Sequence, residues 1–321
     1  TPDWIVRYMV ENSLGRLWLE GHPNDSLKSG WKYYLDEAEQ EAEVQAQLAI
    51  IREEYKDIKP EEIKVIDPCM GSGHILVYAF DVLMQIYESC GYSQRDAARS
   101  IVENNLYGLD IDQRAYQLAY FAVMMKARQY NRRILGEGVR CNLYAIEESN
   151  GINRQQLQYF GQSMDPLARN LAMTQMQALL DMMKDAKEYG SIIKMEQMDW
   201  PLLREFVASA GFTGQMTFDA VGLEETKARL QQLVEVGALL AQKYDVVVTN
   251  PPYMGSSGMG ASLAEFVKRE YPDTKSDLST VFMEKTLNLC QASGFMAMIN
   301  IPVWMFLSSY ERLREYIVKN H

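Results

Sequence analysis

Apolar and polar residues alternate with helical spacing at the start of the chain, because apolar side chains recur every three or four positions over residues 3–20. The opening Thr-Pro-Asp predicts the start of that helix. Residues 21–30, GHPNDSLKSG, are rich in Gly, Pro, Asn and Ser and predict a loop. Residues 31–56 are charged, Glu-rich and helical in pattern, and they end before Pro60. The pattern therefore predicts an amino-terminal helical segment over residues 1–62.

The pattern then changes to short β-branched runs separated by longer amphipathic stretches. The run IKVID (63–67) is followed by a glycine-rich turn and an apolar helix. A second short strand in ENNLYGLDID closes on acidic residues, and a helix is expected over 113–133. A third strand is expected over 139–146. Strands alternating with helices predict a parallel sheet with helices on both faces, so residues 63–149 form the first half of an α/β domain.

The alternation stops over residues 150–243, where the chain is amphipathic and rich in methionine. We interpret this region as a helical insertion, whose methionines fill its core. The piece SIIKM (191–195) fits a short strand or a helix start. Strand patterns return at 244–249 and 294–301, so residues 244–321 complete the sheet.

Composition and charge limit the classes of function. The chain has 321 residues, 47% of them apolar and 23% charged, which is typical of a globular protein with a large core. The formal net charge is −11, whereas DNA-binding modules are normally basic. If nucleic acid is the substrate, contacts with phosphate must be local or come from elsewhere.

The cysteines and the chain start bear on compartment and metal binding. Four cysteines are scattered without CxxC or CxxH spacing, which argues against a zinc site and a disulfide framework and favours reduced thiols in the cytoplasm. No apolar run approaches about 18 residues, and no signal peptide is visible. The chain opens without Met, and we expect it to be a fragment of a longer protein.

The first glycine turn, DPCMGSG, directly follows a strand and precedes a helix. In an open parallel sheet, ligands bind beyond the carboxyl ends of the strands, and Gly71 and Gly73 allow a ligand to approach the backbone. A dinucleotide site normally has a third glycine, which is missing here. Asp67 would repel a pyrophosphate but would suit an ammonium group. The turn therefore favours S-adenosylmethionine over a dinucleotide, although a tight turn without a ligand is the alternative.

The second strand ends in GLDID, which places carboxylates at the same edge of the sheet. Asp110 is positioned to accept hydrogen bonds from both hydroxyls of a ribose, as the acidic residue of nucleotide-binding α/β folds does. Asp at a strand end can instead cap the next helix. Asp112, just before Gln113, is the candidate for that cap, which leaves Asp110 available for ribose.

The strand at 244–249 stops at Asn-Pro-Pro-Tyr. The side-chain oxygen of Asn250 and the carbonyl of Pro251 are two acceptors, Pro252 stiffens the turn, and Tyr253 offers an aromatic face. Two acceptors and a stacking ring suit an exocyclic amine on a flipped, planar base. Transfer would be direct displacement at a sulfonium methyl, carried by positioning and electrostatics. A rigid proline turn that ends a strand is the alternative.

DPCMGSGHIL, GLDID and NPPY, in this order and separation, resemble the motifs of the N6-adenine DNA methyltransferases whose recognition domain follows the catalytic one. The segment TPDWIVRYMVENSLGRLW, the insertion and the residues after 276 are most similar to PglX-type methyltransferases of BREX phage-defence systems. The resemblance implies a Rossmann-like α/β fold and transfer of a methyl group from S-adenosyl-L-methionine to N6 of adenine in double-stranded DNA. Defence-system proteins are implied as partners, with neither a metal nor a membrane.

The resemblance also implies roles for individual residues. Asn250, Pro251, Pro252 and Tyr253 would hold the target base. Asp110 would bind the ribose of the cofactor and Ile111 would pack on its adenine. The remaining cofactor contacts would come from Thr1, Asp67, Pro68, Cys69, Gly71, Gly73 and Asn250, with Cys69 interpreted as a packing residue of the turn. The residue that reads the cofactor's adenine amino group stays open between Glu147, Glu148, Ser149 and residues near Ser191.

Some features leave alternatives. Relatives carry a target-recognition domain that we do not find before the last residue, so we expect specific DNA binding to need it. The stretch GSSGMG (255–260) fits a mobile loop that closes on substrate, or a plain connector. Motifs of this kind also occur in N5-glutamine protein methyltransferases and in RNA amino-methyltransferases, and a cofactor-sensing scaffold subunit of a defence complex is a further alternative.

Overall fold

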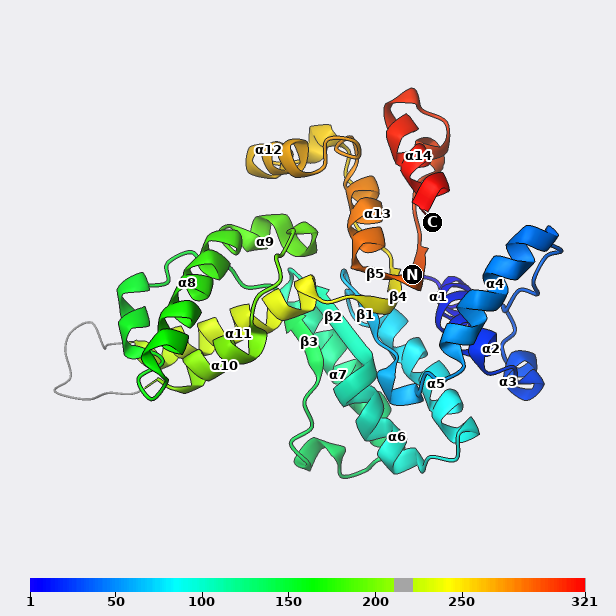
Figure 1. Ribbon diagram of the computed structural model, residues 1–321, viewed down its shortest axis with the longest axis horizontal. Helices are drawn as coiled ribbons and strands as arrows, with labels where there is room; N and C mark the ends of the chain where they lie inside the picture. Colours follow the sequence, from blue (N-terminus) through cyan, green and yellow to red (C-terminus); the bar gives the residue numbers. More distant parts are fainter. Residues whose placement is uncertain (211–221, 321) are drawn as a thin grey trace. The chain divides into compact units, whose positions relative to one another are not determined.

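The computed structural model describes residues 1–210 and 222–320, so residues 211–221 of the predicted insertion lie outside the described part. The chain divides into two compact units. One unit combines Thr1–Leu143 with Lys243–His321, and the other is Tyr144–Gln242. The sheet predicted from the sequence is present, and the chain has the expected α/β class (Figure 1).

The sheet has five strands in the order β3-β2-β1-β4-β5. The strands are β1 (Val65–Asp67), β2 (Leu106–Asp110), β3 (Asn142–Ala145), β4 (Tyr244–Thr249) and β5 (Cys290–Met298). Strand β1 runs parallel to both β2 and β4, and β4 runs parallel to β5. The β-branched runs are buried on both sides, as a parallel sheet covered by helices requires.

The connections between strands determine which face each helix covers. Helix α5 (His74–Ser89) follows β1, α7 (Gln113–Tyr130) follows β2, and α13 (Leu278–Leu289) joins β4 to β5. Parallel crossovers are right-handed, so a connection that moves one way across the sheet places its helix on the opposite face from a connection that moves the other way. The chain moves outward from β1 to β3 on one side and from β4 to β5 on the other, so the strand order reverses between β1 and β4. In open α/β sheets that reversal point is where ligands bind.

The amino-terminal segment is helical from α1 (Asp3–Val10) through a π turn at Glu11–Gly15 to α2 (Arg16–Gly21). It buries Leu14, Leu17 and Trp18 in the same core as α5. Burial of these side chains stabilises the packing of the segment on the sheet domain, because each fully buried large apolar side chain contributes about 1.5–3 kcal/mol. The predicted first helix is therefore confirmed, with a π turn in its middle.

Two predictions in this segment were wrong. The predicted loop at 21–30 contains α3 (Asp25–Gly30), because the Asn24 side chain caps it by accepting from the backbone N–H groups of Ser26 and Leu27. The predicted helix over 31–56 begins only at α4 (Ala42–Tyr55). Side chains of the first helix bind the backbone of residues 33–35 instead: Glu11 accepts from the N–H of Tyr33, and Asn12 accepts from that of Leu35.

The second unit is helical. Its helices are α8 (Pro166–Met182), α9 (Ala186–Tyr189), α10 (Trp200–Ala208) and α11 (Leu223–Ala241). Met176 and Met183 are fully buried, which confirms the predicted core-filling role for these two, whereas Met173 and Met182 are only partly buried. The ambiguous piece SIIKM forms a 3₁₀ turn at Gly190–Ile192 rather than a strand.

The first unit is completed by α6 (Gln94–Ser100), α12 (Ala261–Glu270) and α14 (Glu311–Asn320). Strand β5 begins at Cys290, four residues before the predicted start, and ends at Met298. Within residues 1–210 and 222–320, no helix is long and apolar enough to cross a membrane.

Candidate active site

The glycine turn and the Asn-Pro-Pro-Tyr turn follow β1 and β4, the two neighbouring strands at the reversal point of the sheet. A buried hydrogen bond joins them. The hydroxyl of Thr249 donates to Oδ1 of Asp67 over 2.7 Å, and neither side chain is more than 1% exposed. The residue before Asn250 is thus bound to the first residue of the glycine turn. Sequence reasoning missed this contact, because it depends on the register of two strands about 180 residues apart.

Asp67 organises the turn from inside the protein. Its Oδ1 also accepts the backbone N–H of Cys69 over 3.0 Å. Burial raises the pKa of this carboxyl to about 7, although the hydrogen bonds from Thr249 and Cys69 act in the opposite direction. The carboxyl group of Asp67 is enclosed by protein. Its predicted contact with the ammonium group of a ligand stays a prediction.

The two glycines of the turn have different surroundings. Gly71 has a φ of 51°, and a Cβ added to it would meet nothing within 4 Å. Gly73 has a φ of 82°, and a Cβ there would lie 3.0 Å from the backbone and side chain of Ala119 on α7. Gly73 is therefore needed for close packing of turn and helix, whereas Gly71 leaves open space beside the backbone where a ligand fits.

The carboxylate of Asp110 ties the turn to the second strand. Its Oδ2 accepts the N–H of Gly71 over 2.9 Å, and its Oδ1 accepts the N–H of Asp112 over 2.8 Å. Each carboxylate oxygen has two lone pairs, so both oxygens can still accept from a ribose. The neighbouring Ile111 is 53% exposed, as a side chain that packs on a ligand would be. Asp112 caps α7, which confirms the role predicted for it.

The Asn250 side chain is held at both ends. Its Nδ2 donates to Oγ1 of Thr1 over 3.0 Å, and its Oδ1 accepts from the hydroxyl of Tyr253 over 2.8 Å. The Tyr253 hydroxyl also lies 3.2 Å from the carbonyl oxygen of Ile299, and burial raises its pKa. The ring of Tyr253 is 48% exposed, so an aromatic face remains available. Pro251 is buried and Pro252 exposed.

Thr1, Asn250 and Tyr253 therefore lie together, and Asp67, Gly71 and Asp110 form a second connected set. The Thr249–Asp67 hydrogen bond links the two sets. The glycine turn and the amide of Asn250 therefore lie at the carboxyl ends of two neighbouring strands. Ile299 was not predicted, and only its position directly after β5 could have pointed to it.

Comparisons with known proteins identify the family of the chain. The family model "Eco57I restriction-modification methylase" matches residues 104–321, and "N-6 DNA Methylase" matches residues 40–138. The chain belongs to the Eco57I methylase family. It is 43% identical, over its whole length, to the adenine-specific methyltransferase BrxX of Escherichia coli O9:H4 (strain HS). It is 42% identical, over 98% of its length, to the adenine-specific methyltransferase PglX of Lacticaseibacillus casei (strain Zhang).

The chain covers 28% of BrxX and 26% of PglX, so it spans less than a third of the length of these relatives. The resemblance to adenine methyltransferases and to PglX-type proteins, seen in the motifs, is confirmed. The roles of the individual site residues stay predictions.

The remaining residues near the two turns fall into two groups. His74 is the first residue of α5, and its Nδ1 lies 2.9 Å from the Ser72 hydroxyl. Pro68 is buried and Cys69 half-buried in the turn. The candidates for reading the adenine amino group all belong to the second unit, where Glu147 pairs with Lys187 and Ser149 donates to the carbonyl of Leu180. The choice among them stays open.

The loop after the Asn-Pro-Pro-Tyr turn is attached to the start of α13. Ser256 donates its N–H to the carbonyl of Ser276, and Leu278 donates its N–H to the carbonyl of Met254. Asp277 caps α13 by accepting from the N–H of Ser279. The predicted closure of the loop on substrate stays a prediction.

The raised pKa of Asp67 predicts a pH dependence of stability. Unfolded, the carboxyl titrates near 3.9, and folded it titrates at about 7. Between these two pH values the Asp67 carboxyl is protonated in the folded state but not in the unfolded state. The contribution of this carboxyl to the unfolding free energy is therefore complete below about pH 4 and decreases as the pH rises to about 7. Asp67→Asn is expected to flatten this slope. Urea unfolding at a series of pH values measures it, and an unchanged slope would contradict the prediction.

Proposed function

We propose that the protein transfers the methyl group of S-adenosyl-L-methionine to N6 of adenine in DNA, and that it marks host DNA in a phage-defence or restriction-modification system. The observation that carries the proposal is the direct link between the two turns: Thr249, the residue before Asn250, donates to Asp67 of the glycine turn. A methyl donor and an acceptor amine would meet at that edge. The two relatives, both adenine-specific methyltransferases, support the same reaction.

The described residues fit S-adenosyl-L-methionine as the donor. Open space beside Gly71, spare lone pairs on Asp110 and the exposed side chain of Ile111 would accommodate a methionyl part, a ribose and an adenine. No phosphate is needed, which suits a turn that begins with a carboxyl group. When bound, the donor supplies a methyl group on a positively charged sulfur, open to direct displacement.

The acceptor side would use the Asn-Pro-Pro-Tyr turn. Oδ1 of Asn250 and the carbonyl oxygen of Pro251 would accept the two hydrogens of a flipped adenine's amine, while the ring of Tyr253 stacks on the base. These acceptors favour a pyramidal, more nucleophilic nitrogen. With the donor bound, the nitrogen would take the methyl group as the carbon–sulfur bond breaks, the sulfur would leave as a neutral thioether, and the extra proton on the nitrogen would pass to water. Thr1 and Tyr253 would keep the amide of Asn250 in place.

DNA and protein partners follow from the same proposal. The net charge of −11 gives this chain little general attraction for phosphates, so sequence-specific binding would need further residues of a longer protein. The relatives are more than three times as long as the aligned part. Other proteins of a defence system are proposed partners, and the cytoplasm is the proposed compartment.

The test is to incubate the full-length protein with a labelled methyl donor and unmethylated host DNA. Label in N6-methyladenine after digestion is the expected result. Label in protein glutamine or in RNA would support the related amino-methyltransferases instead. Binding of the donor without transfer to any of these would support a cofactor-sensing scaffold role.

A further inference from the structure

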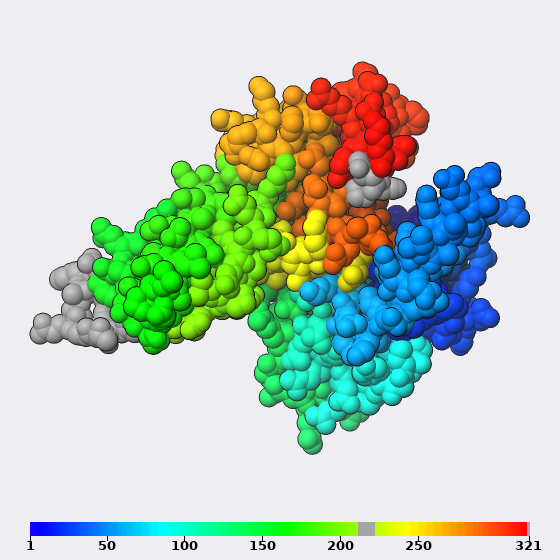
Figure 2. All heavy atoms as spheres, viewed as in Figure 1, coloured from blue at the N-terminus to red at the C-terminus, as the bar shows by residue number. Residues whose placement is uncertain are grey.

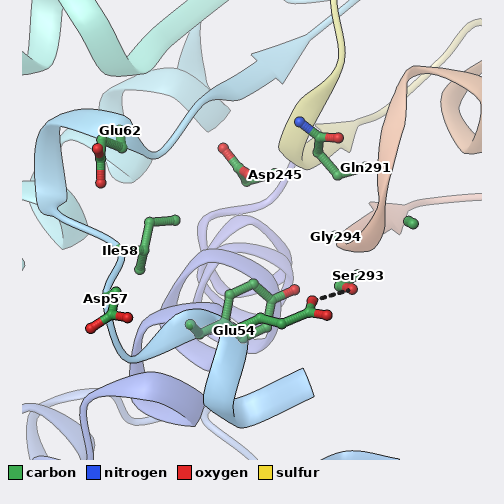
Figure 3. A pocket seen from close by; sticks show the side chains of 10 residues that line it. Glu54, Asp57, Ile58, Glu62, Asp245, Gln291, Ser293 and Gly294 are labelled. Atoms are coloured by element: carbon green, nitrogen blue, oxygen red, sulfur yellow. Dashed lines mark hydrogen bonds between the residues drawn. The ribbon is translucent and has the colours of Figure 1, made fainter. Parts of the chain in front are cut away.

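The first unit contains a pocket at the amino ends of the strands, whereas the candidate active site lies at their carboxyl ends. We call it the amino-edge pocket. It has a volume of about 470 Å³, and its lining comes from the end of α4, the following loop, the first residues of β4 and residues 291–294 of β5. In Figure 2 the light-blue residues of the α4 end adjoin the orange residues near 290. The Ser293 hydroxyl donates to Oε2 of Glu54 over 3.0 Å and connects the two sides (Figure 3).

The lining is strongly acidic. It includes the carboxylates Glu54, Asp57, Glu62 and Asp245, while none of the described residues that line it is Lys, Arg or His. Figure 3 shows Glu54 and Asp57 on the α4 side and Asp245 on the strand side. Asp245 is the most enclosed: its Oδ2 accepts the N–H of Lys64 over 2.8 Å, and burial raises its pKa although the Lys64 charge lowers it. The pocket thus attracts cations and excludes phosphates.

Tyr55 gives a second, independent sign of a ligand. It lines the pocket and is 6% exposed, and its hydroxyl has no hydrogen-bond partner among the residues that the structure describes. Burial, and next the charge of Asp245, raise the pKa of this phenol, so the hydroxyl stays protonated. A buried hydroxyl without a partner lowers stability, and a polar group entering beside Asp245 would remove that penalty.

The kind of cation follows from the spacing of these groups. Across the described residues, no three His, Cys, Asp or Glu side chains are close enough to hold a metal ion together. The pocket combines separated carboxylates with the apolar side chains of Ile58 and Ala292. This lining suits a flexible aliphatic chain whose positive charges are separated by methylene groups. Methylene groups would lie on the apolar side chains, and ammonium groups would reach the carboxylates and the oxygen of Tyr55.

We propose that the amino-edge pocket binds an aliphatic polyamine. The site lies in the same unit as the candidate active site but shares no residue with it. The proposal does not depend on the methyl-transfer reaction, and the site can be tested without donor or DNA.

The probe is spermidine, titrated into the full-length protein by calorimetry at fixed ionic strength. Saturable binding at one site is expected. The double variant Glu54→Gln, Asp57→Asn removes two exposed carboxylates and should weaken binding at least ~10-fold. Glu43→Gln removes an exposed carboxylate elsewhere on α4 and should leave the affinity unchanged, which controls for net charge.

Tyr55→Phe tests the buried hydroxyl separately. Because the unpartnered oxygen is removed, the variant is expected to melt no lower than the parent without ligand. It should also gain less thermal stability from spermidine. An equal gain in the variant and the parent would overturn the assignment. So would non-saturable binding, or equal competition by Mg²⁺ at the same ionic strength, since either describes a diffuse ion atmosphere.

Discussion

Replacing Asn250 with alanine is expected to lower the rate constant of methyl transfer at least ~100-fold, the usual effect of removing one positioned hydrogen-bonding group from an active site. The donor site is expected to survive, because the polar contacts of the Asn250 side chain are with Thr1 and Tyr253 rather than with the glycine turn. Single-turnover transfer to DNA measures the rate, and calorimetry with S-adenosyl-L-methionine measures donor affinity. Loss of both to the same extent would contradict a role in holding the base.

Tyr253→Phe is the matched variant for this experiment. It keeps the aromatic face but removes the hydroxyl that donates to Asn250 and lies near the carbonyl of Ile299. A single neutral hydrogen bond contributes about 0.5–1.5 kcal/mol, so transfer is expected to fall by roughly 2–10-fold. A fall as large as that of Asn250→Ala would mean that the hydroxyl itself is essential and that stacking is secondary.

The sequence predicted the elements that carry the site because these elements are defined locally. Strands β1 and β4 are short, buried runs rich in β-branched residues, and each is followed within four residues by one that changes the backbone, Gly71 after β1 and Pro251 after β4. The cap at Asp112 is equally local, since its carboxylate accepts N–H groups two and three residues ahead. Motifs of this kind need no knowledge of the fold.

The parts that could not be predicted depend on contacts distant in sequence. Residues 31–41 have a helical pattern, yet Glu11 and Asn12 bind the backbone at Tyr33 and Leu35, so tertiary contacts override propensity. The Thr249–Asp67 hydrogen bond requires β4 to lie beside β1, and no local pattern specifies that order. The enclosure of Asp67 follows from the same pairing. Its carboxyl was expected to face a ligand, whereas the protein itself provides the hydrogen bonds observed.

These long-range contacts also explain why the two turns would act together. Asp110 binds the backbone of Gly71, and Asp67 binds that of Cys69, so the donor turn is fixed by carboxylates from two adjacent strands. Thr249 then connects Asp67 to the strand that ends at Asn250. These hydrogen bonds would couple the position of the glycine turn to that of Asn250. The proposed methyl donor and acceptor amine would then keep a fixed separation, as direct displacement requires.

The second large effect is expected from Asp110→Ala. This variant removes the acceptor of the Gly71 and Asp112 N–H groups and the proposed ribose contact together. Charge-assisted hydrogen bonds contribute about 1.5–3 kcal/mol, so the affinity for S-adenosyl-L-methionine is expected to fall by roughly 10–150-fold. Transfer at saturating donor should fall much less than in Asn250→Ala. Calorimetry with the donor gives the first quantity, and the rate at saturation gives the second.

Asp112→Ala is the matched control, because it removes a carboxylate two residues away. Asp112 caps α7 through the N–H groups of Arg114 and Ala115, so its loss should lower the unfolding free energy by about 1 kcal/mol. Its carboxylate makes no hydrogen bond to the glycine turn among the described residues, so donor affinity should stay the same. An unchanged affinity in Asp110→Ala would remove Asp110 from the donor site. An equal loss in both variants would assign the effect to general damage at this edge of the sheet.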